Sequence, residues 1–551
     1  MVDLELVLPL LQICHNFRDI VYKCFCRCYS IDLAIGAKEL TTLWDSWPYR
    51  FKILDHGAFH LVRKLSVSFG LGSIFSGKAL QLLSHGFFSD LSFSNAHTLA
   101  VVLNCSAPRE QQHDGDMFSS PDAEANIRAF VLRVKQLAPL ANDVSIHPHR
   151  GTDYQIEGVD CQFGSLTSQL FQLARRIEYR SIMPKTPTVL QFDGFCGLTR
   201  IVFNTISPTL DGKDELMQVV RKSARTLQNL HISACARASI SARGLVQGDD
   251  GNFVEYPCLA TLKLGQFFYF LNHQPPVTSS GILFPSLRYL SIDGHYPFGD
   301  DTPFRGNSAT LESLHIAPRP ELYNILHKFS VFTPTSHPKL WCVRTNAMYG
   351  RVTDAESNDE SDEEPIHRPN GFQSTDALIK FVLSIAPDAT VRVIATIGVL
   401  DGGFDALSEL RNHGNIQVLA LSGMVLPLWF VGSLLSWLPL LSDLHCMAVL
   451  SDPLTEDAAM DNLLAFRRSL HDVTNRRFRC WRIGNAEDYS VKEVLVCVLA
   501  VAMICPNFVH IALPFYDHSE LMAMLEEVIK SGEFVQIESQ LQRLLFIRDR
   551  Y

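Results

Sequence analysis

The sequence predicts an α/β fold made of repeated helix–strand units, with the strands in a parallel sheet and the helices on its other side. Three observations support this fold class. A short apolar phrase recurs along the chain, the segments between its copies have helical periodicity, and 47% of the residues are hydrophobic while 19% are charged. A chain of 551 residues with this composition can bury more core than one ordinary domain.

The recurring phrase is a Leu, two variable residues, an aliphatic residue, one variable residue and another apolar residue. Its clearest copies are LQNLHIS from Leu227, LATLKLG from Leu259, LRYLSID from Leu287 and LESLHIA from Leu311. Alternation at the last two apolar positions predicts a short strand with one buried face. The first Leu is expected to pack inside the turn that leads into this strand. Most copies lie roughly 24 to 36 residues apart. Looser copies begin at Val62, Ala174, Leu198, Ile416, Leu441, Phe478, Phe508 and Leu541.

The segments that lead into these copies predict helices. DELMQVVRKSARTL, SLTSQLFQLARRI and SVKEVLVCVLAVAMICP each have apolar residues at helical spacing. The polar stretch 106–126 reads as a surface loop that Asp122 closes as a helix cap. Because one helix–strand unit cannot bury its own apolar face, the units must stack on their neighbours in an arc.

From about Leu61 to the C-terminus these phrases resemble leucine-rich repeats, which implies a solenoid of helix–strand repeats. The Asn that normally follows the family's phrase is missing here. Only the copy LQNLHIS has the other residue that the family accepts at this position, a cysteine, Cys235. We therefore expect an irregular leucine-rich-repeat-like solenoid, with an irregular sheet of packed αβ units as the alternative.

The segment 8–33, LPLLQICHNFRDIVYKCFCRCYSIDL, is rich in cysteine, but the chain has no CxxC pair, so no metal site is predicted. Its order of residues resembles the second half of an F-box, as in divergent fungal F-box and leucine-rich-repeat proteins. The resemblance implies a Skp1-type adaptor as partner and a role as substrate receptor of an SCF-type ubiquitin ligase. By position, the matching residues are Leu11, Cys14, Phe17, Arg18 and Ile20, followed by a strand with Tyr29, Ser30, Ile31 and Leu33.

The opening Leu-Pro-acidic part of that motif would lie upstream of Leu11, and the chain begins too late to contain it. Two interpretations stay open: a degenerate adaptor, or a helical cap over the exposed end of the repeats. The predicted organisation is a partial F-box-like cap over 1–35, repeats over 36–350, an acidic disordered loop over 351–371 and further repeats over 372–551. In the acidic loop, Ser357 and Ser361 are candidate phosphorylation sites because each has an acidic residue three positions on.

The open face of the sheet is the predicted protein-binding surface, and the protein is predicted not to be an enzyme. No GxSxG, HExxH or EF-hand pattern is present. One alternative is nucleotide binding at Gly72-x₄-Gly77-Lys78, which is close to a P-loop but has Ala79 in place of the Mg²⁺-binding Ser or Thr. A scaffold without a ligase role is another. The predicted outward residues of the clear copies are Asn229, His231, Lys263, Tyr289, Ser291, Asp293, Ser313 and His315.

Composition argues against several other classes of function. The net charge of −10 comes largely from the acidic loop, and a nearly neutral body makes a nucleic-acid partner unexpected. The apolar stretch 424–441 is interrupted by prolines and 494–505 is too short for a bilayer, so no membrane association is expected. Fourteen cysteines without a secretory signal favour the cytoplasm or nucleus. We expect a monomer without a cofactor.

Overall fold

The computed structural model describes residues 28–33, 62–84, 91–104, 122–148, 160–172, 174–180, 197–206, 213–234, 240–248, 251–265, 268–269, 283–294, 309–318, 337–347, 380, 383–400, 407–449, 475–482, 491–512, 518–532, 538 and 542. The chain divides into two compact units. The N-terminal unit comprises residues 1–286 and 297–299, and the C-terminal unit comprises 287–296 and 300–551.

The N-terminal unit contains a parallel sheet with strand order β1-β2-β3-β4-β5-β6-β7-β9, so neighbouring strands follow one another along the chain. A separate pair is formed by β8 (Ile240–Ser241) and β10 (Phe268–Tyr269). The sheet strands are β1 (Cys28–Leu33), β2 (Lys64–Gly70), β3 (Thr98–Asn104), β4 (Asp143–Pro148), β5 (Arg176–Arg180), β6 (Arg200–Ile206), β7 (Asn229–Ala234) and β9 (Thr261–Leu264). The helices are α5 (Leu71–Phe75), α6 (Lys78–Ser84), α7 (Ala123–Leu137), α8 (Asp160–Phe171), α9 (Lys213–Lys222) and α10 (Ala242–Val246).

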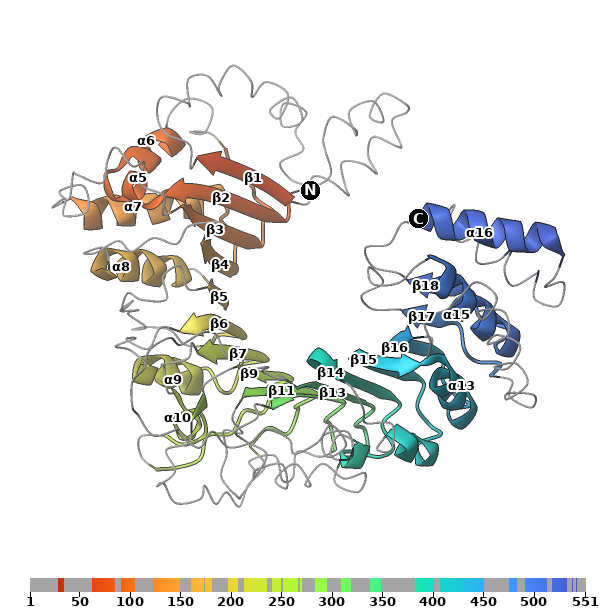
Figure 1. Ribbon diagram of the computed structural model, residues 1–551. Coiled ribbons are helices and arrows are strands. Elements are labelled where there is room, and N and C mark those ends of the chain that lie inside the picture. The colour runs from red at the N-terminus through yellow and green to blue at the C-terminus, as the bar shows by residue number, and fades with distance from the viewer. Residues whose placement is uncertain are drawn as a thin grey trace, which may run out of the picture. The chain divides into compact units, whose positions relative to one another are not determined.

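The C-terminal unit repeats this arrangement in a parallel sheet ordered β11-β12-β13-β14-β15-β16-β17-β18. Its strands are β11 (Tyr289–Gly294), β12 (Ser313–Pro318), β13 (Cys342–Ala347), β14 (Val391–Leu400), β15 (Val418–Pro427), β16 (Asp443–Val449), β17 (Cys480–Arg482) and β18 (His510–Ala512). Its helices are the 3₁₀ helix η7 (Ser408–Asn412), α13 (Leu428–Trp437), α15 (Val491–Ile504) and α16 (His518–Ser531). In each unit the described helices lie along one side of the sheet (Figure 1).

These elements confirm the predicted α/β class, the parallel sheet and a solenoid-like order of helix and strand. The three helical segments named from the sequence form α9, α8 and α15. The central aliphatic residues of neighbouring copies are direct partners in register: Leu230 lies opposite Leu262, and Leu290 lies opposite Leu314. All four leucines are fully buried. Within each unit, the phrase therefore aligns buried leucines of neighbouring strands in one row beneath the helices.

A ladder of main-chain hydrogen bonds joins the strands where they begin. The carbonyl of Thr199 accepts hydrogen bonds from the N–H groups of both Gln228 and Asn229, and the same two-to-one pattern recurs across the N-terminal unit. In the C-terminal unit, the carbonyl of Ser442 accepts from Arg479 and Cys480 in the same way. Each strand is thereby fixed in register to the one before it.

A second ladder uses side chains that directly precede the phrase. A Ser, Thr or Asn comes directly before the first apolar residue of several copies and donates to a carbonyl of the preceding turn. Thr226 Oγ1 donates to Leu198 O and Thr310 Oγ1 to Leu287 O, both at 2.9 Å. Ser286, Asn415 and Asn507 donate in the same manner to the carbonyls of Pro257, Asp388 and Arg476. Side-chain hydrogen bonds therefore hold the turns between repeats, and their donors come before the phrase instead of after it.

The structure departs from the sequence-based predictions at a helix cap and at several strands. Asp122 does occupy the N-cap of α7, but its side chain makes no capping hydrogen bond. Strands β4, β8, β10, β13 and β14 are not predicted, because their sequences do not follow the full phrase. The strand expected from the copy at Leu541 lies outside the described residues, apart from Gln542, which is helical and donates a hydrogen bond to Glu538.

Candidate functional site: the open sheet faces

The outward side chains of each sheet form rows across the strands, because residues in register stand side by side in a parallel sheet. In the N-terminal unit one row contains Arg200, Asn229 and Thr261, and the next contains Val202, His231 and Lys263. These residues alternate with buried positions such as Leu230 and Leu262. Asn229, His231 and Lys263 therefore lie on the face opposite the apolar row, at the positions expected from the sequence.

His231 lies in a partly buried position on this face. Burial lowers the pKa of His231, and the positive charge of Lys263 on the next strand lowers it further. The imidazole is therefore uncharged near neutral pH and offers one donor and one acceptor. A neutral imidazole can hydrogen-bond to polar groups of a partner without the cost of burying a charge.

Charged residues that the sequence patterns do not single out form a cluster beside these positions. Arg200 on β6 lies 3.0 Å from the Glu178 carboxylate on β5 and 3.8 Å from that of Asp143 on β4. Burial raises the pKa of Asp143 despite the opposing effect of Arg200. The cluster spans three strands and was missed because each residue lies in a looser copy of the phrase or in none. Alternation around Ile177 and Ile201 was the signal that could have placed it.

The first strands of the C-terminal unit carry the other predicted surface residues. Tyr289 lies opposite Ser313, and Ser291 lies opposite His315. Ser291 Oγ is 2.9 Å from His315 Nδ1, so these two form a polar contact across β11 and β12. Asp293 lies in β11 opposite Ala317, but its side chain is outside the described residues. The remaining predicted residues thus share one face of this unit.

Farther along the same sheet, Asp443, Cys480 and His510 occupy one register row. Cys480 Sγ lies 3.1 Å from His510 Nδ1. Burial and the nearby Asp443 carboxylate raise the pKa of the Cys480 thiol. Because the thiolate is the nucleophilic form, a thiol kept protonated in this way is a weak nucleophile. The row thus places a carboxylate, a thiol and an imidazole side by side on three successive strands.

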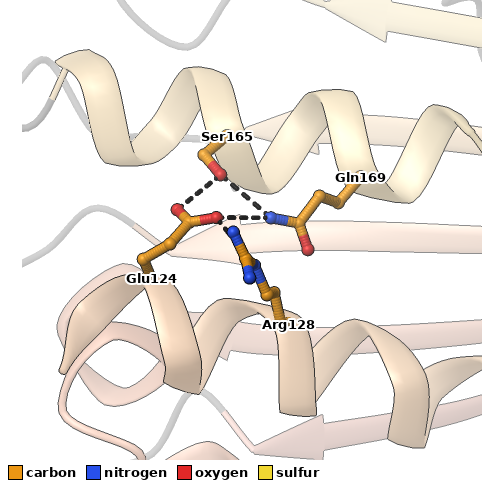
Figure 2. Close-up of polar contacts among 4 residues, drawn as sticks. All are labelled: Glu124, Arg128, Ser165 and Gln169. Atoms are coloured by element: carbon orange, nitrogen blue, oxygen red, sulfur yellow. Dashed lines mark hydrogen bonds and ion pairs between the residues drawn. The ribbon is translucent and has the colours of Figure 1, made fainter. Parts of the chain in front are cut away.

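The polar cluster in Figure 2 lies among the helices of the N-terminal unit. Glu124 of α7 accepts hydrogen bonds from Ser165 (2.7 Å) and Gln169 (3.0 Å) of α8 and pairs with Arg128 at 3.2 Å. Gln169 also donates to Ser165 Oγ at 3.0 Å, so the four side chains share one set of contacts. The cluster links α7 to α8.

The glycine-rich segment considered for nucleotide binding folds as two short helices, α5 and α6, joined at Gly77. Ile74 and Phe75 are fully buried instead of leaving space for phosphates. Gly77 has a φ of +76° and lies against Asn126, whose amide donates to Phe75 O at 2.8 Å. The glycine therefore serves a tight turn packed on α7, and the open phosphate loop is not formed.

Several predicted residues lie outside the described part of the chain. They are the F-box-like residues Leu11, Cys14, Phe17, Arg18 and Ile20, together with the candidate phosphorylation sites Ser357 and Ser361. The strand expected after the F-box-like segment is present as β1, which pairs in parallel with β2.

No group of three or more His, Cys, Asp and Glu residues among those that the structure describes is placed to hold a metal ion. No described helix combines the length and apolar character needed to span a membrane.

Neither a scan against protein-family models nor a search of curated proteins gives a match for this chain.

Proposed function

We propose that the chain is a non-enzymatic, leucine-rich-repeat-like protein that binds another protein on the open faces of its sheets. The observation that carries this proposal is the register of the outward rows: polar and charged side chains from successive strands stand side by side opposite the buried aliphatic row. The main-chain ladder holds their backbone rigid before any partner arrives. Preorganised side chains on a fixed frame lose little entropy on binding.

Affinity purification with matched variants tests this proposal. Lys263→Glu changes the open face of the N-terminal unit, and Lys135→Glu makes the same change on α7, on the helix side. We expect a protein that co-purifies with the wild type and with Lys135→Glu to be retained at least about tenfold less by Lys263→Glu. Thermal unfolding should show both variants folded. Equal retention of every partner by the two variants would contradict the proposed role of this face.

We further propose that the protein acts as a degenerate F-box substrate receptor of an SCF-type ubiquitin ligase. Support comes from the F-box-like residues named above and from β1, the strand that follows them. Because β1 pairs along its whole length with β2, a deletion of 8–33 would also unpair the sheet. Point variants that spare β1 are therefore the sharper test.

We expect a Skp1-type protein to co-purify with the wild type and with Asn16→Asp, which lies outside the matched positions. Leu11→Asp should abolish this association, because it places a charge at an apolar position of the F-box-like segment. If the wild type retains no Skp1-type protein, the chain is a scaffold without a ligase role. That result would leave the proposed protein binding by the sheet faces intact.

A further inference from the structure

The open face of the C-terminal unit has an apolar centre. Val391 and Val393 of β14 lie in register with Val418 and Ala420 of β15, which makes a square of four aliphatic side chains. The three valines are partly exposed and Ala420 is 8% exposed, whereas the alternating residues Ile394 and Leu419 are fully buried. Aliphatic side chains left at a polar surface are a usual feature of a protein-binding centre.

An arginine stands on each side of this centre, in one register row. That row runs from Arg344 on β13 through Val393, Ala420 and His445 to Arg482 on β17. Four strand spacings separate the two arginines, which is about 19 Å at the usual distance between strands. Both are exposed, and no ion pair joins either one to a carboxylate in the described part of the chain.

His445 does not add a third positive charge to this row. Burial lowers the pKa of His445, and Arg482 on the next strand lowers it further. The imidazole is therefore neutral near pH 7, and the row presents positive charge at its two ends with an uncharged middle. A nucleic acid would need cations repeated along its phosphates, and this row does not provide them.

We propose that this face binds an extended protein segment in which an apolar residue lies between two acidic residues. The segment would cross the strands, with its apolar side chain on the β14–β15 centre and one carboxylate on each arginine. At about 3.3 Å per residue, carboxylates about six residues apart span the distance between the arginines. Arginine suits this pairing because its planar guanidinium binds a carboxylate through two parallel hydrogen bonds. The inference rests on the proposed function and specifies the chemistry of the partner.

Selection from a random peptide display library tests the inference, because it offers the chain acidic and apolar residues in every order and spacing. We expect the wild-type full chain to enrich peptides that carry two acidic residues about six positions apart with an aliphatic residue between them. A fluorescent peptide of this kind should bind about tenfold more weakly to Arg344→Glu and to Arg482→Glu. Lys530→Glu, a charge change on α16 of the same unit, should bind it like the wild type.

A charge swap separates specific recognition from a general loss of folding. The double variant Arg344→Glu and Arg482→Glu should bind the same peptide with lysines in place of its acidic residues, and the wild type should not. Val393→Ser should weaken both pairings, because it removes part of the shared apolar centre.

The inference is overturned if no acidic–apolar–acidic peptide is enriched, or if the arginine variants bind it like the wild type. Tighter binding of a single-stranded RNA oligonucleotide than of the selected peptides at physiological salt would also overturn it. These results can occur while Lys263→Glu still loses its protein partner. The proposed protein binding by the sheet faces would then stand, and only the acidic–apolar–acidic ligand of the C-terminal face would be wrong.

Discussion

Arg392 shows how a single residue can depart from the repeat pattern and still stabilise the fold. It occupies the row that Leu290, Leu314 and Leu419 occupy on other strands, and its side chain is fully buried. Its guanidinium donates to the carbonyls of Ile385 and Ala386. Ala386 has a φ of 44°, a left-handed conformation that an alanine rarely adopts. The arginine therefore holds a turn whose backbone is in an uncommon conformation.

Replacing Arg392 with alanine should destabilise the protein by about 3 kcal/mol, because two buried carbonyls lose their donors and a cavity remains. Arg344→Ala is the matched control: it removes an exposed arginine from the neighbouring strand and should change stability by less than about 0.5 kcal/mol. Urea unfolding followed by far-ultraviolet circular dichroism measures both. A loss no larger for Arg392→Ala than for the control would show that the turn does not depend on the guanidinium.

At the scale of the element, strands are predicted best where the phrase is most regular. The copies from Leu227, Leu259, Leu287 and Leu311 form β7, β9, β11 and β12. The strands β13 and β14 escape prediction because Thr345 and Arg392 stand where the phrase has apolar residues. The side-chain ladder is also missed, although a Ser, Thr or Asn before the phrase is visible in the sequence. Single polar residues carry little signal until the turn that they bond to is known.

Removing one hydroxyl from this ladder tests its contribution. Thr226→Val and Thr310→Val should each lower the free energy of unfolding by about 1 kcal/mol, since each leaves a carbonyl of the preceding turn without its 2.9 Å hydrogen bond. Thr261→Val makes the same replacement at an outward strand position, where valine is well tolerated. Denaturant unfolding measures the stability of the three variants. Equal stability of all three would show that the side-chain ladder does not contribute to the free energy of unfolding.

At the scale of the whole molecule, the class of fold and the shared face of the surface residues could be predicted from the sequence. Both depend on alternation, which a sequence displays directly. Alternation around Ile177 and Ile201 could have placed Glu178 and Arg200 on the outward face. Their pairing, like the Cys480–His510 contact, could not be predicted, because it depends on which strands are neighbours and in what register. The division into two units was also not predictable, since the repeat phrase continues across residue 287.

The stability of the whole molecule should depend on pH through a histidine on the face of each unit. Burial lowers the pKa of both His231 and His445 below the ordinary value of 6.5. Below pH 6.5 the unfolded chain therefore binds protons at these sites before the folded chain does, which favours unfolding. The stability that the neutral histidines allow is fully present above about pH 6.5. It is lost as the pH falls toward the lowered pKa values of the folded state.

Urea unfolding at pH 7.5 and pH 5.5 measures this dependence. The wild type should unfold at a lower urea concentration at pH 5.5, and His231→Gln combined with His445→Gln should reduce the difference between the two pH values, since glutamine does not titrate. Burial also raises the pKa of the Asp143 carboxyl above its ordinary value of 3.8, but Asp143 is present in both proteins, so the comparison isolates the two histidines. An equal loss of stability in the wild type and the double variant would mean that other groups carry the pH dependence, and that the two imidazoles are better solvated than their positions on the sheets imply.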